Sequence, residues 1–415
     1  MKKKKLLASL VVALFVSTTV LAGCSKKTDD VKTDDNVPQV LNYYSSDEPE
    51  TLDPQQMTGQ IDFQIANMFM EGLVRFGKED GKYEPGVASK WSLDEATNTY
   101  TFELNKDAKW ADGTQVTAKD FFFGWKLALD GNSQYGFMIT DYVKGAADYA
   151  SFTAESYYAE KDAKFKALVD SRDDESDKDK KAALTAKVAD AFKLMPADMM
   201  TTFDTMKADL WSKVGIAEKD GNIEVSLSKV VPYFVGLTAN FVYAPVNEEF
   251  YNAHPDDYAL ETTGLNSNGA WKVTEWKHKD SFTLEKNPEY WNKDNVKIDT
   301  IKLKVVNDIA TRTNLLKTGA LDGSAIQAND LKDFQDKAVL DQHKLQDLIN
   351  KPDYAVFYLE FNLFNNKITQ NVNIRKAISL AQDRQGLVES VTMGDAPALS
   401  LIPNFFPGLD KSIRE

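Results

Sequence analysis

The chain holds few of the side chains that carry out covalent or metal chemistry. It has one cysteine, Cys24, and three histidines, His254, His278 and His343. No histidine stands in a HExxH or other paired spacing, so the sequence gives no local support for a zinc site. Motifs of the GxSxG, GxxxxGK[ST] and GxGxxG kinds are also absent from the sequence. We therefore predict no catalytic residue, no metal and no cofactor, and a protein that is not an enzyme.

Cys24 lies at the end of an N-terminal leader. Lys2 to Lys5 precede an apolar run from Leu6 to Val16, and Leu21-Ala22-Gly23 lead directly into the cysteine. A basic start, a short apolar core and a small-residue end are typical of a secretory signal, and a bilayer span needs about 20 apolar residues. The last four residues resemble the lipobox of bacterial lipoproteins. That resemblance implies a signal peptide over 1–23 and acylation of Cys24; the alternative is an ordinary signal with a chance cysteine.

The composition indicates an acidic exported domain. The formal net charge is −14, and loss of the four leader lysines makes it about −18, which disfavours nucleic acid and anionic lipid headgroups. We therefore expect membrane contact through lipid on Cys24. With its one thiol so used, the domain has no disulfides and must be stabilised by a packed core. Residues 24–39 are polar and lack aromatic side chains, which predicts a flexible tether.

The remaining sequence mixes strand and helix patterns. Helical spacing predicts helices over 61–73, 308–316 and 375–381, and one that opens at Thr117 and runs through Leu129. Thr117 suits the N-cap of that helix, and Asp120 suits the positive end of its dipole. The stretch 155–213 is dense in Lys and Asp and predicts a helical insert with a solvated charged face; a partner-binding face is the alternative. Predicted strands lie at 40–44, 100–104, 223–227, 281–285, 300–306 and 354–361.

These elements do not follow strict βαβ alternation, which favours an α/β (mixed α+β) chain of two to three domains at about 150 residues each. Several motifs then follow one another in a fixed order. The most specific is the run from Ala108 to Phe121, which reads AKWADGTQVTAKDF. The others are Thr51 to Pro54, Met70 to Val74, Pro85 to Trp91, Tyr100 to Leu104, Val231 to Phe234, Pro245 to Asn247, Asn268 to Trp271, Asn287 to Trp291, Lys317 to Asp322, and Ile374 to Ile378 with Asp383-Arg384.

Taken together, these segments resemble the oligopeptide-binding lipoproteins of ABC importers, a peptide- and nickel-binding family of extracellular solute receptors (family 5). The match extends over nearly all of residues 40–410. The resemblance implies a two-lobed periplasmic-binding-protein-like fold with an extra domain. It places a discontinuous lobe-one domain at 40–69 and 236–323, the extra domain at 70–235 and a second-lobe domain at 324–415. Family members usually run much longer, so we expect the second lobe to be incomplete and the aspartate that pairs with a peptide's α-amino group to be missing.

The same resemblance supplies candidate ligand-binding residues, which match positions lining the family's cleft. They are Thr58, Gly59, Gln60, Tyr135, Asn240, Asn268, Gly269 and Ala270. From the residues alone, Gly59 is as easily a turn glycine and Tyr135 a core tyrosine. We expect Trp110, Asp112 and Gly113 to shape a turn, and Arg375, Asp383 and Arg384 to form a buried or lobe-internal ion pair.

The predicted function is capture of oligopeptides and their delivery to the permease subunits of an ABC transporter. The predicted protein is a monomer held by lipid on the outer face of a Gram-positive cell membrane. Peptides of varied sequence share only their backbone, which can be bound as an added strand between lobes that close around it. Two alternatives stay open: a receptor of the same fold for nickel, haem or a signalling peptide, and a lipid-anchored surface enzyme or foldase.

Overall fold

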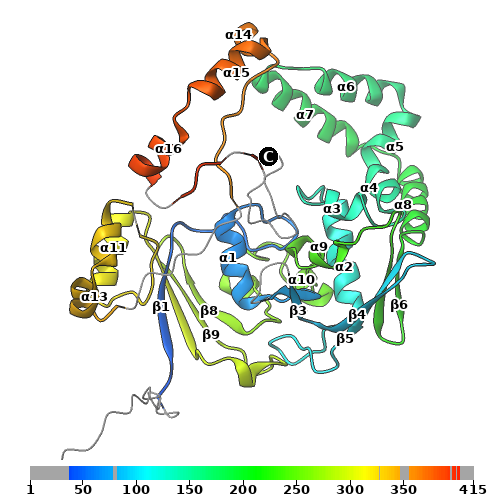
Figure 1. The fold of residues 1–415 in the computed structure, drawn as a ribbon. Helices are drawn as coiled ribbons and strands as arrows, with labels where there is room; N and C mark the ends of the chain where they lie inside the picture. The colour runs from blue at the N-terminus through cyan, green and yellow to red at the C-terminus, as the bar shows by residue number, and fades with distance from the viewer. Residues whose placement is uncertain are drawn as a thin grey trace, which may run out of the picture. The chain divides into compact units, whose positions relative to one another are not determined.

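The computed structural model describes residues 37–77, 82–326, 328–345, 355–392, 395–398 and 400–401 (Figure 1). Cys24, the predicted signal peptide and the tether up to residue 36 lie outside the described residues. Within those residues no helix combines the length and the apolar character that a bilayer crossing requires. The chain from Gln39 onward forms one compact unit with two large hydrophobic cores.

The first core lies on a four-stranded sheet in the order β1-β10-β9-β8. Its strands are β1 (Val40–Ser45), β8 (Trp271–Lys277), β9 (Ser281–Lys286) and β10 (Thr300–Val305). The first strand runs parallel to β10, and the other pairs are antiparallel. Helix α1 (Gln60–Phe69) packs on β8 and buries Ile65, Ala66 and Phe69. The predicted strands at 40–44, 281–285 and 300–306 are therefore confirmed.

The helix predicted over 61–73 ends four residues earlier than expected. Helix α1 ends at Phe69, because Met70 already has an extended backbone (φ −118°, ψ 147°). Beyond it the backbone finds partners elsewhere: the Glu71 N–H donates to the Asn268 side chain and the Gly72 carbonyl accepts from the Val87 N–H. Tertiary hydrogen bonds replace helical ones here, and residues 70–73 become the crossover between the two cores.

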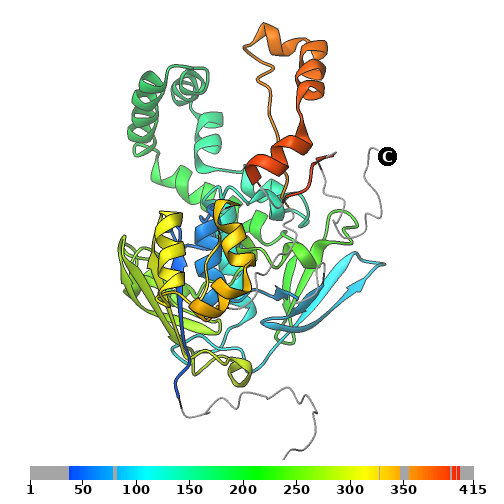
Figure 2. The same ribbon diagram turned by 60° about the vertical axis from the view of Figure 1, so that its left-hand side comes forward.

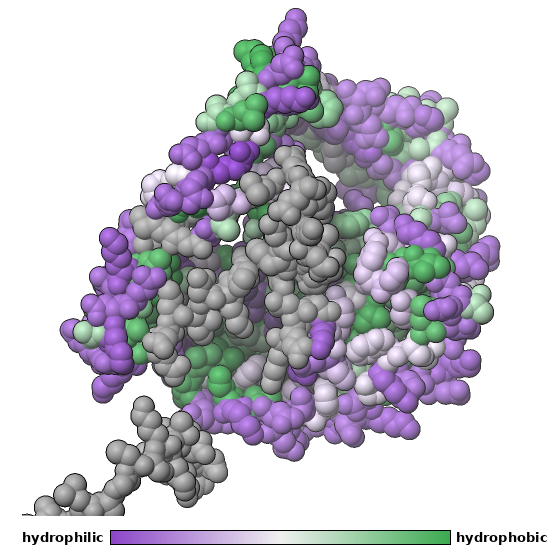
Figure 3. Space-filling view, viewed as in Figure 1, coloured by the Kyte–Doolittle hydropathy of each residue, from purple (hydrophilic) through white to green (hydrophobic). Residues whose placement is uncertain are grey.

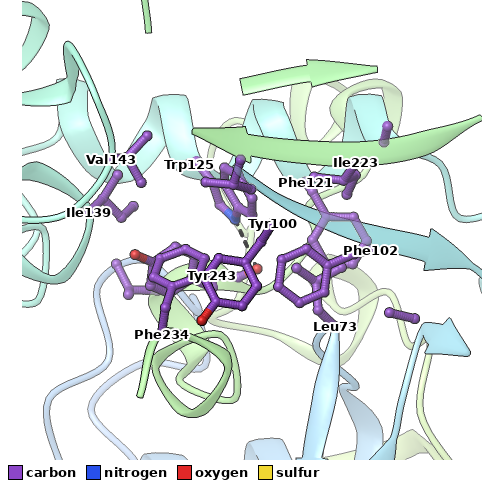
Figure 4. Packing of buried hydrophobic residues seen from close by; sticks show 14 of the residues in the cluster. Leu73, Tyr100, Phe102, Phe121, Trp125, Ile139, Val143, Ile223, Phe234 and Tyr243 are labelled. Atoms are coloured by element: carbon purple, nitrogen blue, oxygen red, sulfur yellow. Dashed lines mark hydrogen bonds between the residues drawn. The ribbon is translucent and has the colours of Figure 1, made fainter. Parts of the chain in front are cut away.

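The second core lies on an antiparallel sheet in the order β4-β5-β7-β6. The strands are β4 (Ala88–Asp94), β5 (Thr99–Leu104), β6 (Ile216–Lys219) and β7 (Asn222–Ser226), and a separate ribbon pairs β2 (Val74–Phe76) with β3 (Tyr83–Pro85). Phe102 and Phe121 are fully buried in this core. The Trp125 indole N–H donates to the Tyr243 carbonyl at 2.9 Å within it (Figure 4). The predicted strands at 100–104 and 223–227 are confirmed.

Helix α2 (Ala118–Asp130) begins as its sequence predicts. Thr117 is the N-cap, and the Asp120 carboxylate accepts its backbone N–H at 2.7 Å and its hydroxyl at 2.8 Å. The preceding motif forms a tight turn in which the Gly113 N–H donates to the Trp110 carbonyl. Gly113 has φ +90°, a left-handed conformation that favours glycine, and the Asp112 carboxylate accepts the next backbone N–H. The predicted helix start at Thr117 and the predicted turn at Trp110, Asp112 and Gly113 are both confirmed.

The charged stretch 155–213 is helical throughout most of its length. It contains α5 (Ala154–Lys161), α6 (Ala163–Asp173), α7 (Lys178–Phe192) and α8 (Ala197–Trp211). Figure 2 shows α6 and α7 side by side, and a small core of Tyr158, Phe165 and Val188 holds them together. The Arg172 guanidinium binds Glu155 through two hydrogen bonds of 2.8 Å. The helical insert is confirmed.

Shorter helices complete the described chain. They are α3 (Phe137–Thr140), α4 (Ala146–Ser151), α9 (Phe234–Leu237), η1 (Phe241–Tyr243), α10 (Glu248–Ala253), η2 (Thr262–Gly264), η3 (Lys293–Asn295), α11 (Ile309–Lys317), η4 (Ala328–Asp330), α12 (Leu331–Gln335), α13 (Lys337–His343), α14 (Lys367–Gln370), α15 (Val372–Ala381), α16 (Arg384–Leu387) and the π-helical η5 (Val388–Thr392). The helices predicted at 308–316 and 375–381 correspond to α11 and α15.

Two predictions for the later chain are wrong. Residues 355–361 form no strand, because no described segment pairs with them, and Phe357 is 89% exposed. The expected ion pair is also not formed among the described residues: Arg375 donates to the carbonyls of Thr369 and Gln370, and Asp383 caps α16. Many apolar side chains of 355–392 are exposed, and Figure 3 shows hydrophobic surface over α14 and α15 at the top of the view.

Candidate ligand-binding site

The first predicted site segment forms the start of α1. Gly59 is the N-cap, and its N–H donates to the Asp62 carboxylate at 2.9 Å. That carboxylate is buried, and a Cβ on Gly59 would lie only 2.9 Å from it. Thr58 and Gln60 are exposed on either side. Gly59 therefore serves the cap, while its two neighbours present polar side chains to solvent.

A row of four aromatic rings connects three of the predicted segments. Phe63 in α1 stacks on Phe241 with ring centroids 5.7 Å apart, and it meets the edge of Tyr135 at 5.9 Å. Tyr135 in turn contacts Phe137 at 6.2 Å. Phe137 is 50% exposed and the other three rings are half-buried. We call Phe241, Phe63, Tyr135 and Phe137 the aromatic row; it offers ring faces and edges for apolar contact.

Asn240 directly precedes the row. Its side-chain oxygen accepts the Val242 N–H at 3.0 Å and caps η1. This capping bond fixes the turn that brings Phe241 to Phe63. Asn240 therefore holds one end of the aromatic row in place.

Asn268 and Gly269 are bound tightly to the crossover. The Asn268 amide, which is 2% exposed, accepts the Glu71 N–H at 2.9 Å and donates to the Glu71 carbonyl at 2.8 Å. The Gly269 N–H donates to the Phe69 carbonyl, and its own carbonyl accepts from Asn287. A Cβ on Gly269 would lie 2.7 Å from the Phe69 carbonyl carbon, and only glycine avoids this clash because it has no Cβ. These two residues position the loop, and the hydrogen bonds within the protein engage the Asn268 amide and the Gly269 backbone.

A cavity of about 850 Å³ opens beside this loop. Asn240, Phe241, Gly269 and Ala270 all line it, so the structure brings three of the predicted residues together there. Thr58, Gly59 and Gln60 lie at the other end of α1. At 1.5 Å per residue this separation is about 15 Å along the helix. Phe63 within α1 stacks on Phe241, and Phe241 lines the cavity, so the aromatic row meets the cavity at this end.

The wall of the cavity also contains Glu71, which was not among the predicted site residues. Its carboxylate accepts the Tyr290 hydroxyl and the Trp291 indole N–H, each at 2.6 Å, and Arg75 lies 3.8 Å away. Burial raises the pKa of Glu71 to about 7, outweighing those hydrogen bonds and the Arg75 charge. The signal in the sequence was a single acid inside the apolar motif from Met70 to Val74.

The three histidines occupy separate places. His254 pairs with Asp257, His278 lies between Glu48 and Glu261, and His343 bonds the Lys317 carbonyl. In the part of the chain that the structure describes, no group of three or more His, Cys, Asp or Glu residues is arranged to hold a metal ion.

Comparison with curated proteins gives relatives that bind peptides. The dipeptide-binding protein DppE of Bacillus subtilis is 32% identical over 425 residues, an alignment that covers 100% of this chain and 66% of DppE. The chain thus spans slightly less than two thirds of that relative's length.

Two solved structures have the same fold. The pheromone receptor PrgZ matches with a TM-score of 0.64 and 24% identity, over 88% of this chain and 61% of PrgZ. Listeria monocytogenes OppA bound to peptide matches with a TM-score of 0.61 and 26% identity, again over 88% of this chain and 61% of that protein. The mixed α/β fold predicted from the sequence is thereby confirmed as that of these receptors. The family model of the bacterial extracellular solute-binding proteins, family 5, matches residues 82–415, and the chain belongs to that family.

Proposed function

We propose that this chain captures oligopeptides outside the cell and delivers them to the permease of an ABC transporter. The observation that carries the proposal is the cavity of about 850 Å³, which is lined by Phe241, the ring at one end of the aromatic row. Its size lies in the range of cavities that enclose small ligands. DppE and Listeria OppA, which are named for peptide binding, support the same ligand class.

The chemistry of the site suits ligands that vary in sequence. Half-buried rings bind many apolar side chains with little directional demand. The charged groups in the cavity wall are largely paired within the protein, as Arg75 is with Glu84 at 3.3 Å. A site that fixes few side-chain charges discriminates weakly, so the shared peptide backbone would supply most of the specific contacts.

We also propose the domain division expected from the resemblance: 40–69 with 236–323, then 70–235, then 324–415. The two cores support the division between its first two parts. One gathers buried residues from Leu52 to Met70 and from Ala244 to Leu303, and the other gathers residues from Leu73 to Tyr243. The crossover at 70–73 and the segment near Tyr243 are where the chain passes between them.

We propose that the receptor is a monomer anchored by lipid on Cys24 at the outer face of a Gram-positive membrane. The basic and apolar leader that ends at a single cysteine supports this location. Metabolic labelling with a radioactive fatty acid tests it. The wild-type chain should take up label and a Cys24→Ser variant should not; equal labelling of both would contradict the anchor.

Calorimetry of the full-length protein against a mixed library of di- to hexapeptides tests the function. We expect saturable binding that is weakened in a Phe63→Ala variant and unchanged in Phe192→Ala, a control ring in the helical insert. Heat with nickel or haem but none with peptide would favour the other receptor class. Conversion of the peptides during incubation, read by mass spectrometry, would favour an enzyme.

A further inference from the structure

The crossover between the two cores is held by hydrogen bonds at a single residue, Glu71. Met70 before it belongs to the first core and Leu73 after it to the second. Its backbone N–H and carbonyl both bond the Asn268 amide, and its carboxylate accepts from Tyr290 and Trp291. One distant loop is therefore held by the backbone of Glu71 and another by its carboxylate, so both depend on this residue for their position.

The hydrogen bonds of Glu71 also connect it to residues in the wall of the cavity. Asn268 is followed by Gly269 and Ala270, which line the cavity together with Glu71 and Tyr290. The contact between Gly269 and the backbone of Phe69 leaves no room for even one added carbon. A movement of Glu71 would therefore also move Gly269, because close-packed atoms transmit displacement.

The hydrogen bonds of Glu71 differ between its charged and neutral forms. The Trp291 indole N–H can only donate, so it always requires a free oxygen on Glu71. The Tyr290 hydroxyl can donate or accept, so a proton on Glu71 would sit on Oε1 and reverse that bond. Of the charged groups that face Glu71, Arg75 lies 3.8 Å away on β2 and is itself paired with Glu84 on β3.

We propose that Glu71 is a positioning residue whose charge sets the arrangement of the 268–270 side of the cavity, so that peptide capture is tightest when Glu71 is ionised. The proposal rests on the function proposed above. The Tyr290 hydroxyl and the Trp291 indole N–H both donate to the carboxylate, and the Arg75 guanidinium lies 3.8 Å from it, an arrangement that favours the ionised form. The pKa of Glu71, raised to about 7 by burial, puts both forms within reach near neutral pH.

A ligand-free titration tests the positioning role. Tryptophan emission of the full-length protein, followed from about pH 5.5 to 8.5, should show a step near pH 7. The step should vanish in Glu71→Gln and in Trp291→Phe, whose indole reports the change. Glu103→Gln, a half-buried residue of β5, is the matched control and should leave the step in place. In Tyr290→Phe the ionised form loses a donor, so the step should move to higher pH; this variant serves even if Glu71→Gln does not fold.

Peptide affinity supplies the second measurement. For the tightest peptide of the library, we expect wild-type affinity to be at least about threefold higher at pH 8 than at pH 6, and Glu71→Gln affinity to be independent of pH. A titration step that persists in Glu71→Gln, or a wild-type affinity profile that the variant reproduces, would overturn the inference. A step that behaves as expected while no peptide binds at any pH would support the positioning role and overturn the proposed function instead.

Discussion

Replacing Glu71 by Gln should change how the stability of the protein depends on pH. Burial raises the pKa of this carboxyl from its ordinary value of 4.5 to about 7 in the folded chain. Between these values the unfolded chain loses the proton while the folded chain keeps it. The stability that the neutral Glu71 carboxyl contributes is therefore fully present below pH 4.5 and is lost as the pH rises through about 7. A shift of this size corresponds to about 3.4 kcal/mol, because each pKa unit is worth about 1.36 kcal/mol.

Gln is neutral at every pH and removes this linkage. Most of the loss falls within an accessible window: from pH 5.5 to pH 8 the wild-type protein should lose about 2 kcal/mol through Glu71 alone. The free energy of unfolding of Glu71→Gln minus that of wild type should rise by this amount across the window. Urea unfolding followed by tryptophan emission gives both values, and all other titrating groups cancel in the difference. A difference that stays constant within about 0.5 kcal/mol would refute the reasoning.

Three further predictions follow from named contacts. Phe63→Ala removes the central ring of the aromatic row and should weaken peptide binding about tenfold in calorimetry; equal binding would show that the row is not part of the site. Trp125→Phe leaves the buried Tyr243 carbonyl without its 2.9 Å donor and should cost about 1–3 kcal/mol in urea unfolding, whereas an unchanged midpoint would contradict that role. Chymotrypsin should cut first at Phe357, Tyr358 or Leu359, which are 89%, 67% and 63% exposed; earliest cuts within either large core would contradict the described exposure.

Local patterns in the sequence predicted local structure well. Thr117 and Asp120 lie three residues apart, so their capping arrangement depends only on the helix they begin. The strand predicted over 354–361 failed for the opposite reason. Alternating side chains describe a strand's faces, but its backbone must also find a partner, and 355–361 has none among the described residues.

The candidate site was predicted only in part. Family resemblance supplied Asn240, Gly269 and Ala270, which the structure brings to one cavity. It supplied Tyr135 but not the other rings of the aromatic row, because Phe63 and Phe241 meet only once two distant segments have folded together. Glu71 was overlooked since an acid in an apolar motif carries no sign of its partners; its significance comes from Tyr290 and Trp291, far along the chain.

The most direct test of peptide capture is the content of the protein as it leaves the cell. Full-length receptor, purified without denaturation from its own host, would be acidified and the released small molecules identified by mass spectrometry. We predict peptides of mixed sequence at close to one per protein molecule, and a much smaller yield from Phe63→Ala. Release of no peptide, or of a single non-peptide compound at the same stoichiometry, would contradict the proposed function.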